Sequence, residues 1–407
     1  MSSPLAMDYV REQPVWHMTP ADPQQHTLAI AQITADAFAG GQHVDEISRQ
    51  YIGNCHYDWQ TTRLIWDGDR LIHHWGVWGY PMRIGSVQLQ VAGVGAVVTA
   101  EPYRQRGLMH RAARASFLAM AEQGYDVSLL RGRHYAQFGY VRAWNYVTYR
   151  LKAPEVPTLE LVQPYELLGP EHMDGINAMY NREYAPYGGT AVRPTYRMLC
   201  AEDLNAYGWF DEIGQLIGYV RAVPTDDQQT LQCLEATGDP QQCLAVLAAL
   251  FRAGQYETLT FFTLPQQHAV LKFIRRGACV VEDQYFFHSG WQVRLVNLQR
   301  ALLKLRPVLE ARVQHSPLTD WRGDLYLAAG EQTATLHLEA GRVTILPGEP
   351  GQHGILGGAD VARFLIGSDE PAEIRQQAAM VCTGRAAELT DVLFPNLHPV
   401  LSQWDEY

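Results

Sequence analysis

The chain has few cysteines for its 407 residues, and none of them forms a C-x-x-C pair. Their scatter is typical neither of a disulfide framework nor of a zinc site. The 6 cysteines are Cys55, Cys200, Cys233, Cys243, Cys279 and Cys382. The one adjacent histidine pair, His73 and His74, would point to opposite faces of a strand and could not easily share a metal ion. We therefore predict reduced thiols and no metal site.

The chain also lacks an excess of positive charge. Lys and Arg number 32 against 43 Asp and Glu, which gives a formal net charge of −11. A protein that binds nucleic acid through a basic face would show the opposite balance. The charge therefore excludes nucleic acid as an expected partner and favours cationic or small neutral partners.

Long apolar runs are absent as well. No segment approaches 18 consecutive apolar residues, so no membrane span is predicted. The first 20 residues carry Asp8, Glu12 and Pro14, where a signal peptide would have a basic start and an apolar run. We expect a cytoplasmic protein.

What the chain does have is a globular composition, with 47% hydrophobic and 18% charged residues. Its length predicts two or three domains of roughly 150 residues each. Four prolines between residues 151 and 170 indicate a linker and a domain boundary; they are Pro154, Pro157, Pro164 and Pro170. The alternation of helix and strand patterns returns after this linker, and a third block follows Trp291.

Periodicity predicts the elements of each block. In the first block we expect helices over 27–38 and 107–123 and strands over 63–66, 71–78, 87–100 and 126–130. In the second we expect a hairpin over 209–223, strands over 231–236, 258–264 and 279–287, and helices over 241–252 and 266–276. In the third we expect a helix ending near Pro307, three strands between 324 and 346, and helices over 359–365 and 385–393.

One segment, from Gly93 to Tyr140, carries recognisable chemistry. A strand containing Gly93 and Gly95 runs into a short turn with Arg104, Arg106 and Gly107, and a helix follows. Backbone N–H groups at a helix start, with basic side chains beside them, bind anions such as phosphate. Glycines in the strand suit a bulge or splay that frees backbone groups for an extended ligand. An ordinary solvated turn is the alternative from these residues alone.

The wider run resembles a known family. Arg104-x-x-Gly107-x-Met109 is similar to the acetyl-CoA pyrophosphate motif [QR]-x-x-G-x-[GA] of the GNAT superfamily, from which it departs at Met109. Together with Gly124-Tyr125 and His134-Tyr135-Ala136-Gln137-Phe138-Gly139-Tyr140, it closely resembles the Eis (enhanced intracellular survival) acetyltransferases.

The resemblance implies a fold class of α/β and α+β type. We expect two tandem GNAT-type mixed-sheet domains over 1–152 and 153–290, the second one degenerate. A sterol-carrier-protein-like α+β domain would then follow over 291–407. The second block has no basic turn after its strand, because the segment from Leu234 to Asp239 contains no Lys or Arg. It is therefore expected to bind no cofactor.

The resemblance also assigns an acetyl-CoA site. The strand backbone should pair with the pantetheine arm, the turn and helix start should hold the pyrophosphate, and two residues of the next strand should lie beside the cofactor. The residues so assigned are Val97, Val98 and Thr99; Arg104, Gln105, Arg106, Gly107, Leu108, Met109 and His110; and Leu130 and Arg131.

The implied reaction is attack of a neutral amine on the acetyl thioester, for which two protons must move. An alkyl thiol has a reference pKa of about 8.5 and a tyrosine one of about 10, so a phenol can protonate the departing thiolate. Tyr135 lies where the family has this general acid; without the resemblance, an aromatic packed in a Tyr/Phe-rich turn is an equally good interpretation.

The end of the chain is the last expected part of the site. Trp404 and Tyr407 are large aromatics, which are unusual at a solvated terminus, and the Eis family returns its C-terminal carboxylate to the first domain. We therefore expect the α-carboxylate of Tyr407 to accept the amine proton, through water, and Glu406 to attract a cationic acceptor.

The predicted function is acetyl-CoA-dependent N-acetylation of a small cationic, aminoglycoside-like or lysine-like amine, without a metal. By analogy with the family, the protein would be a homo-oligomer, a hexamer. The alternative is a lipid- or hydrophobe-binding protein that works through its C-terminal block and keeps only a vestigial acetyltransferase site.

Overall fold

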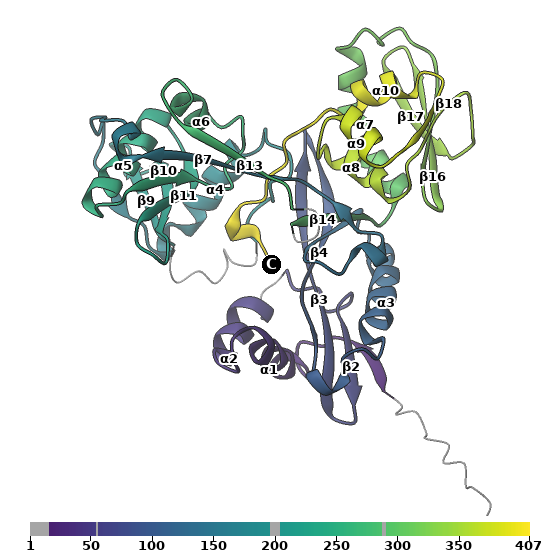
Figure 1. The fold of residues 1–407 in the computed structure, drawn as a ribbon, viewed down its shortest axis with the longest axis horizontal. Coiled ribbons are helices and arrows are strands. Elements are labelled where there is room, and N and C mark those ends of the chain that lie inside the picture. The colour runs from purple at the N-terminus through teal and green to yellow at the C-terminus, as the bar shows by residue number, and fades with distance from the viewer. Residues whose placement is uncertain (1–15, 54–55, 196–203, 287–289) are drawn as a thin grey trace, which may run out of the picture.

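The computed structural model describes residues 16–53, 56–195, 204–286 and 290–407. Cys55 and Cys200 lie outside these ranges. Within them the strands form three mixed sheets, each with its own helices (Figure 1). This confirms the predicted fold class of two mixed-sheet α/β domains followed by an α+β domain. No helix among the described residues is long and apolar enough to cross a membrane.

The first sheet is covered on both faces. Its order is β1 (His17–Pro20), β2 (Arg63–Asp67), β3 (Arg70–Ile84), β4 (Val87–Thr99), β5 (Val127–Arg131), β14 (Trp291–Leu295) and β6 (Val141–Arg142). On one face lie α1 (Thr27–Phe38), α2 (Val44–Glu46) and the π-helix Ile47–Ile52, and on the other lies α3 (Leu108–Glu122), as Figure 1 shows. Leu64 belongs to the core under α1 and its neighbour Ile65 to the core under α3, as strand alternation requires.

The second sheet is built in a similar way. Its order is β13 (Val280–Gln284), β7 (Tyr146–Lys152), β12 (Thr258–Phe261), β11 (Thr230–Thr237), β10 (Leu216–Pro224), β9 (Ala206–Phe210) and β8 (Glu166–Leu167). Its helices are α4 (Met173–Glu183), α5 (Pro240–Ala253) and α6 (Ala269–Ile274). Each of these two sheets contains one strand–helix–strand unit whose two strands pair in parallel. In the first sheet the unit is β4, α3 and β5, and in the second it is β11, α5 and β12.

The third sheet has the order β17 (Arg342–Pro347), β16 (Gln332–Glu339), β15 (Gly323–Ala329), β18 (His353–Leu356) and β19 (Val381–Thr383). Its helices are α7 (Leu298–Gln314), α8 (Val361–Ile366), α9 (Pro371–Gln377) and α10 (Ala386–Leu393). The prediction that the first of these helices ends near Pro307 is wrong. The helix continues for two more turns because Leu309 and Val313 are buried in the same core as Leu305, which offsets the hydrogen bond that the proline cannot donate.

Two strands connect the first and second domains. The chain leaves the first sheet after β6, and β7 then joins the second sheet between β12 and β13. In return, β14 comes back from the second block and pairs with β5 and β6 of the first. The predicted boundaries at 152/153 and 290/291 stay a prediction. Strand pairing shows that β7, just before the first boundary, belongs to the second sheet, and that β14, just after the second boundary, belongs to the first sheet.

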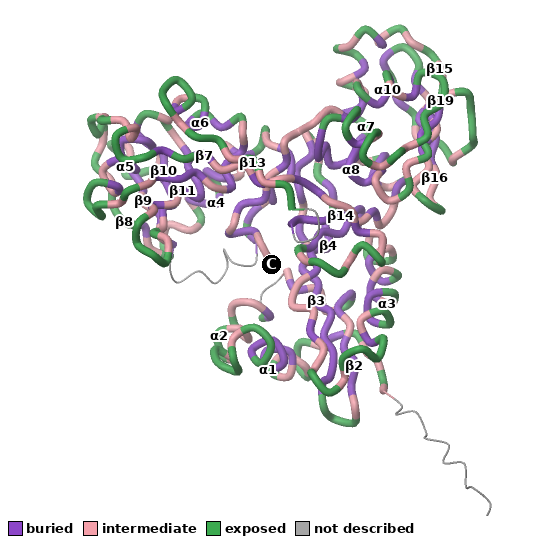
Figure 2. The backbone as a smooth tube through the Cα atoms, in the orientation of Figure 1, coloured by how far each residue is buried: buried purple, intermediate pink, exposed green. Residues whose placement is uncertain are grey.

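The last ten residues connect all three parts. After α10 the chain crosses the second domain, where the N–H of Val400 donates to the carbonyl of Gly188 at 3.1 Å. It then ends beside β3 and β4 of the first sheet (Figure 1). Figure 2 shows that this tail is largely buried or half-buried along its length. The chain terminus is therefore part of the core between the first two domains.

Candidate active site

The turn between β4 and α3 exposes backbone N–H groups. Gln105 and Gly107 adopt positive φ angles of 61° and 74°, and the residues from Arg104 to Gly107 are all exposed. Gly107 is the N-cap of α3, so no side chain caps the helix, and its first turn contains no acidic residue. An uncapped helix start of this kind leaves N–H groups and a positive dipole end available to an anion.

The basic side chains of this turn surround its open end. Arg104 donates through Nε to the carbonyl of Thr99 at 3.3 Å, and the Arg106 guanidinium lies 5.6 Å from the ring centre of Trp16 and 5.8 Å from that of Tyr103. Both guanidinium groups keep further N–H donors for phosphate oxygens. The residues present therefore fit a pyrophosphate.

Strands β4 and β5 separate next to this turn. Their parallel pairing ends at Val94 and Leu130, whereas β4 continues to Thr99 with β3 as its partner on the other side. Among the described residues no strand pairs with the outer edge of β4 beyond this point. Apart from the Thr99 carbonyl, which accepts from Arg104, the outer backbone groups of Val97 to Thr99 are therefore available to an extended ligand, with Leu130 and Arg131 across the gap.

A bulge in β4 accompanies the separation. Val98 is opposite His74 and Gly95 is opposite Gly76, so β4 contains one extra residue here, and Ala96 has a φ of 45°. The Nδ1 of His74 lies 2.7 Å from the Ala96 carbonyl, and its Nε2 lies 2.7 Å from the hydroxyl of Tyr57. Burial lowers the pKa of His74 to about 4, so the ring is neutral. It donates to the carbonyl, accepts from Tyr57 and thereby holds the bulge.

His73 does not join its neighbour in a metal site. Its Nδ1 lies 2.8 Å from the Oγ1 of Thr99, on a different side of β3 from His74. Burial, together with the nearby His74, lowers the pKa of His73 to about 3. No group of His, Cys, Asp and Glu among the described residues could hold a metal ion.

The ring of Tyr407 fills the space left by a glycine. A Cβ atom on Gly93 would lie 2.4 Å from the Cε1 atom of Tyr407. Three aromatic rings surround the phenol, with ring-centre distances of 5.5 Å to Trp291, 5.8 Å to Tyr80 and 6.5 Å to Trp78. Burial, then the nearby Tyr80, raises the pKa of the Tyr407 phenol well above its usual range. The phenol therefore stays neutral and acts as a packing group.

The α-carboxylate lies at the bulge of β4. A Cβ atom on Gly95 would lie 3.3 Å from the carboxylate carbon of Tyr407 and 3.0 Å from the hydroxyl of Tyr51. Just before it, Glu406 forms an ion pair of 2.7 Å with Arg131 at the end of β5. The predicted role of Glu406 in attracting the acceptor stays a prediction, and in the structure this carboxylate is engaged by Arg131.

Tyr135 lies on the α3 side of the sheet. Its ring packs edge-on against Trp75 at 6.1 Å and near Tyr140 at 6.2 Å. Burial raises the pKa of this phenol. No described residue forms a hydrogen bond with its hydroxyl, which leaves that proton without a protein acceptor.

Tyr135 and Tyr407 thus belong to different faces of one sheet. Tyr135 and Val97 pack in the core beneath α3, whereas Tyr407 and Ala96 pack in the core beneath α1. Where β4 separates from β5, the sheet is open between its two faces. A ligand arriving from the α3 side could therefore meet a second ligand beside the terminal carboxylate.

The second domain has the same strand–helix unit, but its own side chains occupy the positions that are open in the first domain. The hydroxyl of Tyr184 lies 3.3 Å from the N–H and 3.4 Å from the carbonyl of Ala236 on β11. The side chain of Asp239 caps α5 by accepting hydrogen bonds from the N–H groups of Gln241 and Gln242. A phenol thus occupies the strand edge and a carboxylate the helix start, and both are unfavourable for a nucleotide cofactor.

Residues 24–143 match the family described as "Acetyltransferase (GNAT) domain". The matched range contains β4, the basic turn, α3 and Tyr135. The protein carries a GNAT N-acetyltransferase domain. This GNAT match implies an acyl-CoA donor and an amine acceptor.

Solved structures share the whole GNAT-containing architecture at low sequence identity. They include a GCN5-related N-acetyltransferase from Anabaena variabilis (TM-score 0.76, 15% identity) and one from Kribbella flavida (TM-score 0.74, 17% identity). Eis1 from Mycobacterium abscessus has a TM-score of 0.68 at 15% identity. Each comparison covers 97% of this chain and 100% of the other. No curated protein matches the chain in sequence.

The structure brings most of the predicted site residues together between two central strands of the first sheet. The three strand residues, the basic turn, Leu130 with Arg131, and the chain end lie around the separation of β4 and β5. Within the turn and helix start, Leu108 is buried, Met109 is partly buried, and His110 is exposed with its Nε2 3.1 Å from the Oε1 of Gln137. Sequence analysis missed the aromatic wall of Trp78, Tyr80 and Trp291. Aromatic residues within strands were its only sequence signal, and that signal also fits an ordinary core.

The basic turn gives a first prediction. Replacing Arg104 and Arg106 together by Ala should weaken acyl-CoA binding about 10-fold, which corresponds to about 1.4 kcal/mol, because two exposed phosphate contacts are lost. Isothermal titration with acetyl-CoA measures the effect. Arg114→Ala, an exposed arginine further along α3, is the matched control and should bind normally. Equal affinity of the double variant and the control would show that the turn is only a solvated surface.

Proposed function

We propose that this protein transfers an acetyl group from acetyl-CoA to the primary amine of a small cationic or lysine-like acceptor. The observation that carries the proposal is the position of the chain end, whose carboxylate carbon lies beside Gly95 at the bulge of the GNAT strand β4. A base is needed on the side of the sheet from which the acceptor arrives. The side chains of Asp405 and Glu406 are ion-paired, which leaves the terminal carboxylate for that task.

The cofactor side of the proposal uses the residues predicted from the sequence. The N–H groups from Gln105 to His110, with Arg104 and Arg106, bind the pyrophosphate. The backbone of Val97 to Thr99 holds the extended arm of the cofactor in the gap beside Leu130 and Arg131. Acetyl-CoA supplies the thioester at the point where this gap reaches the bulge.

The chemical step needs one proton acceptor and one proton donor. As the amine nitrogen bonds to the acetyl carbon, the Tyr407 carboxylate takes the amine proton through a water molecule. The carbon–sulfur bond breaks, and the hydroxyl of Tyr135 gives its proton to the sulfur. A carboxylate of reference pKa about 3.5 is a weak base for an ammonium near 10. Its useful role is therefore to orient the amine and pass the proton onward, in surroundings whose burial raises a carboxyl pKa.

The other expectations gain no specific support. For the hydrophobe-binding alternative, the sheet residues of the third domain that face its helices, among them Leu325, Leu327 and Leu336, are fully buried in a packed core. The hexameric assembly stays a prediction from the Eis resemblance. N-acetylation is the function that the described site supports best.

Tyr135→Phe tests the general acid. The ring and its packing remain while the transferable proton is lost, so kcat should fall about 10²- to 10⁴-fold with acetyl-CoA affinity unchanged. Because burial raises the phenol pKa, the native enzyme should keep this proton up to at least pH 10, and no loss of activity below that pH should come from Tyr135. Tyr103→Phe removes another hydroxyl of the same domain, one bound to Asp67, and should retain turnover. Full turnover by Tyr135→Phe would eliminate the residue from this role.

Two changes at the chain end test the base. Deleting Tyr407, or adding a short glycine-serine extension after it, should lower kcat at least about 100-fold, because the carboxylate leaves the bulge. Acetyl-CoA affinity should stay close to native in both variants. Tm should stay close to native in the extended chain and fall in the deletion variant, because the deletion also removes a packed aromatic ring. Added formate should restore part of the activity of the deletion variant, since a small carboxylate can enter the vacated space. The same extension at the N-terminus is the control, and an extended chain as active as this control would contradict the proposed base.

A further inference from the structure

A buried cluster of ionic groups in the second domain holds the tail two residues before its end. The guanidinium of Arg193 donates to Asp405 from Nε at 3.1 Å and from Nη2 at 3.1 Å. The same guanidinium donates from Nη1 to Glu235 at 2.9 Å. All three side chains have no exposed surface. Such a bidentate, charge-assisted contact fixes both the distance and the orientation of the bound carboxylate.

Each charged side chain in this cluster has hydrogen-bond partners within it. Thr195 donates to Asp405 at 2.6 Å, and Ser402 of the tail donates to Glu235. Burial opposes the charge on Arg193, but Asp405 and Glu235 together raise its pKa well above the usual range. Burial would raise the pKa of Glu235, but Arg193 lowers it overall. Arg193 and Glu235 therefore stay ionised, and the tail contacts a charged guanidinium.

The backbone of Arg193 is held by residues outside the tail. The side chain of Asn181 accepts from the N–H of Arg193 at 2.9 Å and donates to its carbonyl at 2.7 Å. The residues just before Arg193 pair with β3, where the N–H of Val192 donates to the carbonyl of Pro81 at 2.9 Å. Because β3 also carries Trp78 and Tyr80, Arg193 has a defined position relative to the aromatic wall around Tyr407.

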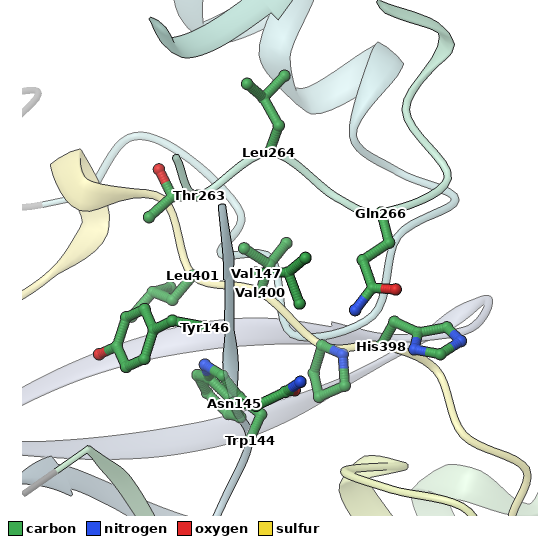
Figure 3. Close-up of a pocket in the computed structure, with 11 residues that line it drawn as sticks. Trp144, Asn145, Tyr146, Val147, Thr263, Leu264, Gln266, His398, Val400 and Leu401 are labelled. Atoms are coloured by element: carbon green, nitrogen blue, oxygen red, sulfur yellow. The ribbon is translucent and has the colours of Figure 1, made fainter. Parts of the chain in front are cut away.

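The neighbouring tail residues reinforce this contact. The guanidinium of Arg221 lies 3.3 Å from the ring centre of Trp404. Further back, Val400 and Leu401 pass beside Val147 and Thr263 and leave a cavity of only about 20 Å³, the space of roughly one water molecule (Figure 3). The tail thus has a close-fitting path across the second domain, and Asp405 is its last ionic contact there.

We propose that Arg193 and Asp405 act as a clamp that positions the C-terminal carboxylate at the bulge of β4, so that the second domain serves catalysis in the first. Two residues span at most about 7 Å, so fixing Asp405 restricts the carboxylate of Tyr407 to a small volume. This inference rests on the proposed function, since it takes that carboxylate to be the base. Arg193 and Asp405 are positioning residues, because neither contacts the reacting atoms.

Asp405→Asn tests the clamp. The substitution keeps the shape of the side chain and leaves Arg193 balanced by Glu235, so the fold should be retained. We expect kcat to fall about 10- to 100-fold, because a displacement of about 1 Å at a reacting group can cost that much. Acetyl-CoA affinity should be unchanged, and added formate should restore part of the activity, as it should for the Tyr407 deletion. Asp391→Asn, which removes a half-exposed carboxylate paired with Arg375 in the third domain, is the matched control and should behave as native.

The outcomes separate the clamp from the proposed base. If Asp405→Asn turns over like the control while the Tyr407 deletion is inactive, the clamp is wrong and the base stands. If both variants turn over normally, the proposed base itself fails. A loss of kcat in Asp405→Asn that comes with weaker acetyl-CoA binding and no response to formate would show a general structural role and overturn the clamp. Should Asp405→Asn not fold, Thr195→Val removes one hydrogen bond to the same carboxylate and is judged by the same measurements.

Discussion

The arrangement of this protein depends on one buried contact, the guanidinium of Arg193 between the carboxylates of Glu235 and Asp405. Desolvating three charges is costly, and it is tolerated here because every charge has a short, well-oriented partner. The contact joins the second domain to residues at the very end of the chain. It thereby restricts the position of the last two residues, and Tyr407 lies at the bulge of the first sheet.

The domains therefore do not work as independent units. The chain passes from the first sheet into the second at β7 and returns to the first at β14. Residues 189–192 pair with β3. The tail of the third domain crosses the second domain to reach the first. The N-terminal domain supplies the separated strands and the basic turn that we propose as the acyl-CoA site. In this chain the other side of the same gap is completed by the tail, with Tyr407 in the space beside Gly93. The tail of the third domain thus supplies a wall of this gap that the N-terminal domain does not provide itself.

Sequence could predict the parts of this site that are local. The glycine-containing strand and the Arg104–Gly107 turn lie within a short segment, and their residue types have few other uses together; the helix over 27–38 has the observed bounds. The role of Gly93 was predicted only in part, because its close approach to Tyr407 joins residues more than 300 positions apart in the sequence. Arg193 and Asp405 gave no sequence signal, since each is an ordinary charged residue until the fold brings them together. The return of the tail was predicted from a family resemblance, supported by the large aromatic residues Trp404 and Tyr407 near its end.

The central claim is that the charge on the last carboxylate, and not merely the presence of Tyr407, is needed for turnover. The most direct measurement is the kcat of a chain that ends in the α-carboxamide of Tyr407, prepared by ligating a synthetic tail peptide, against the same ligated chain with a free carboxylate. The account predicts that the carboxamide form binds acetyl-CoA and melts like its partner but loses at least about 99% of its turnover. Equal kcat values for the two ligated forms would contradict it.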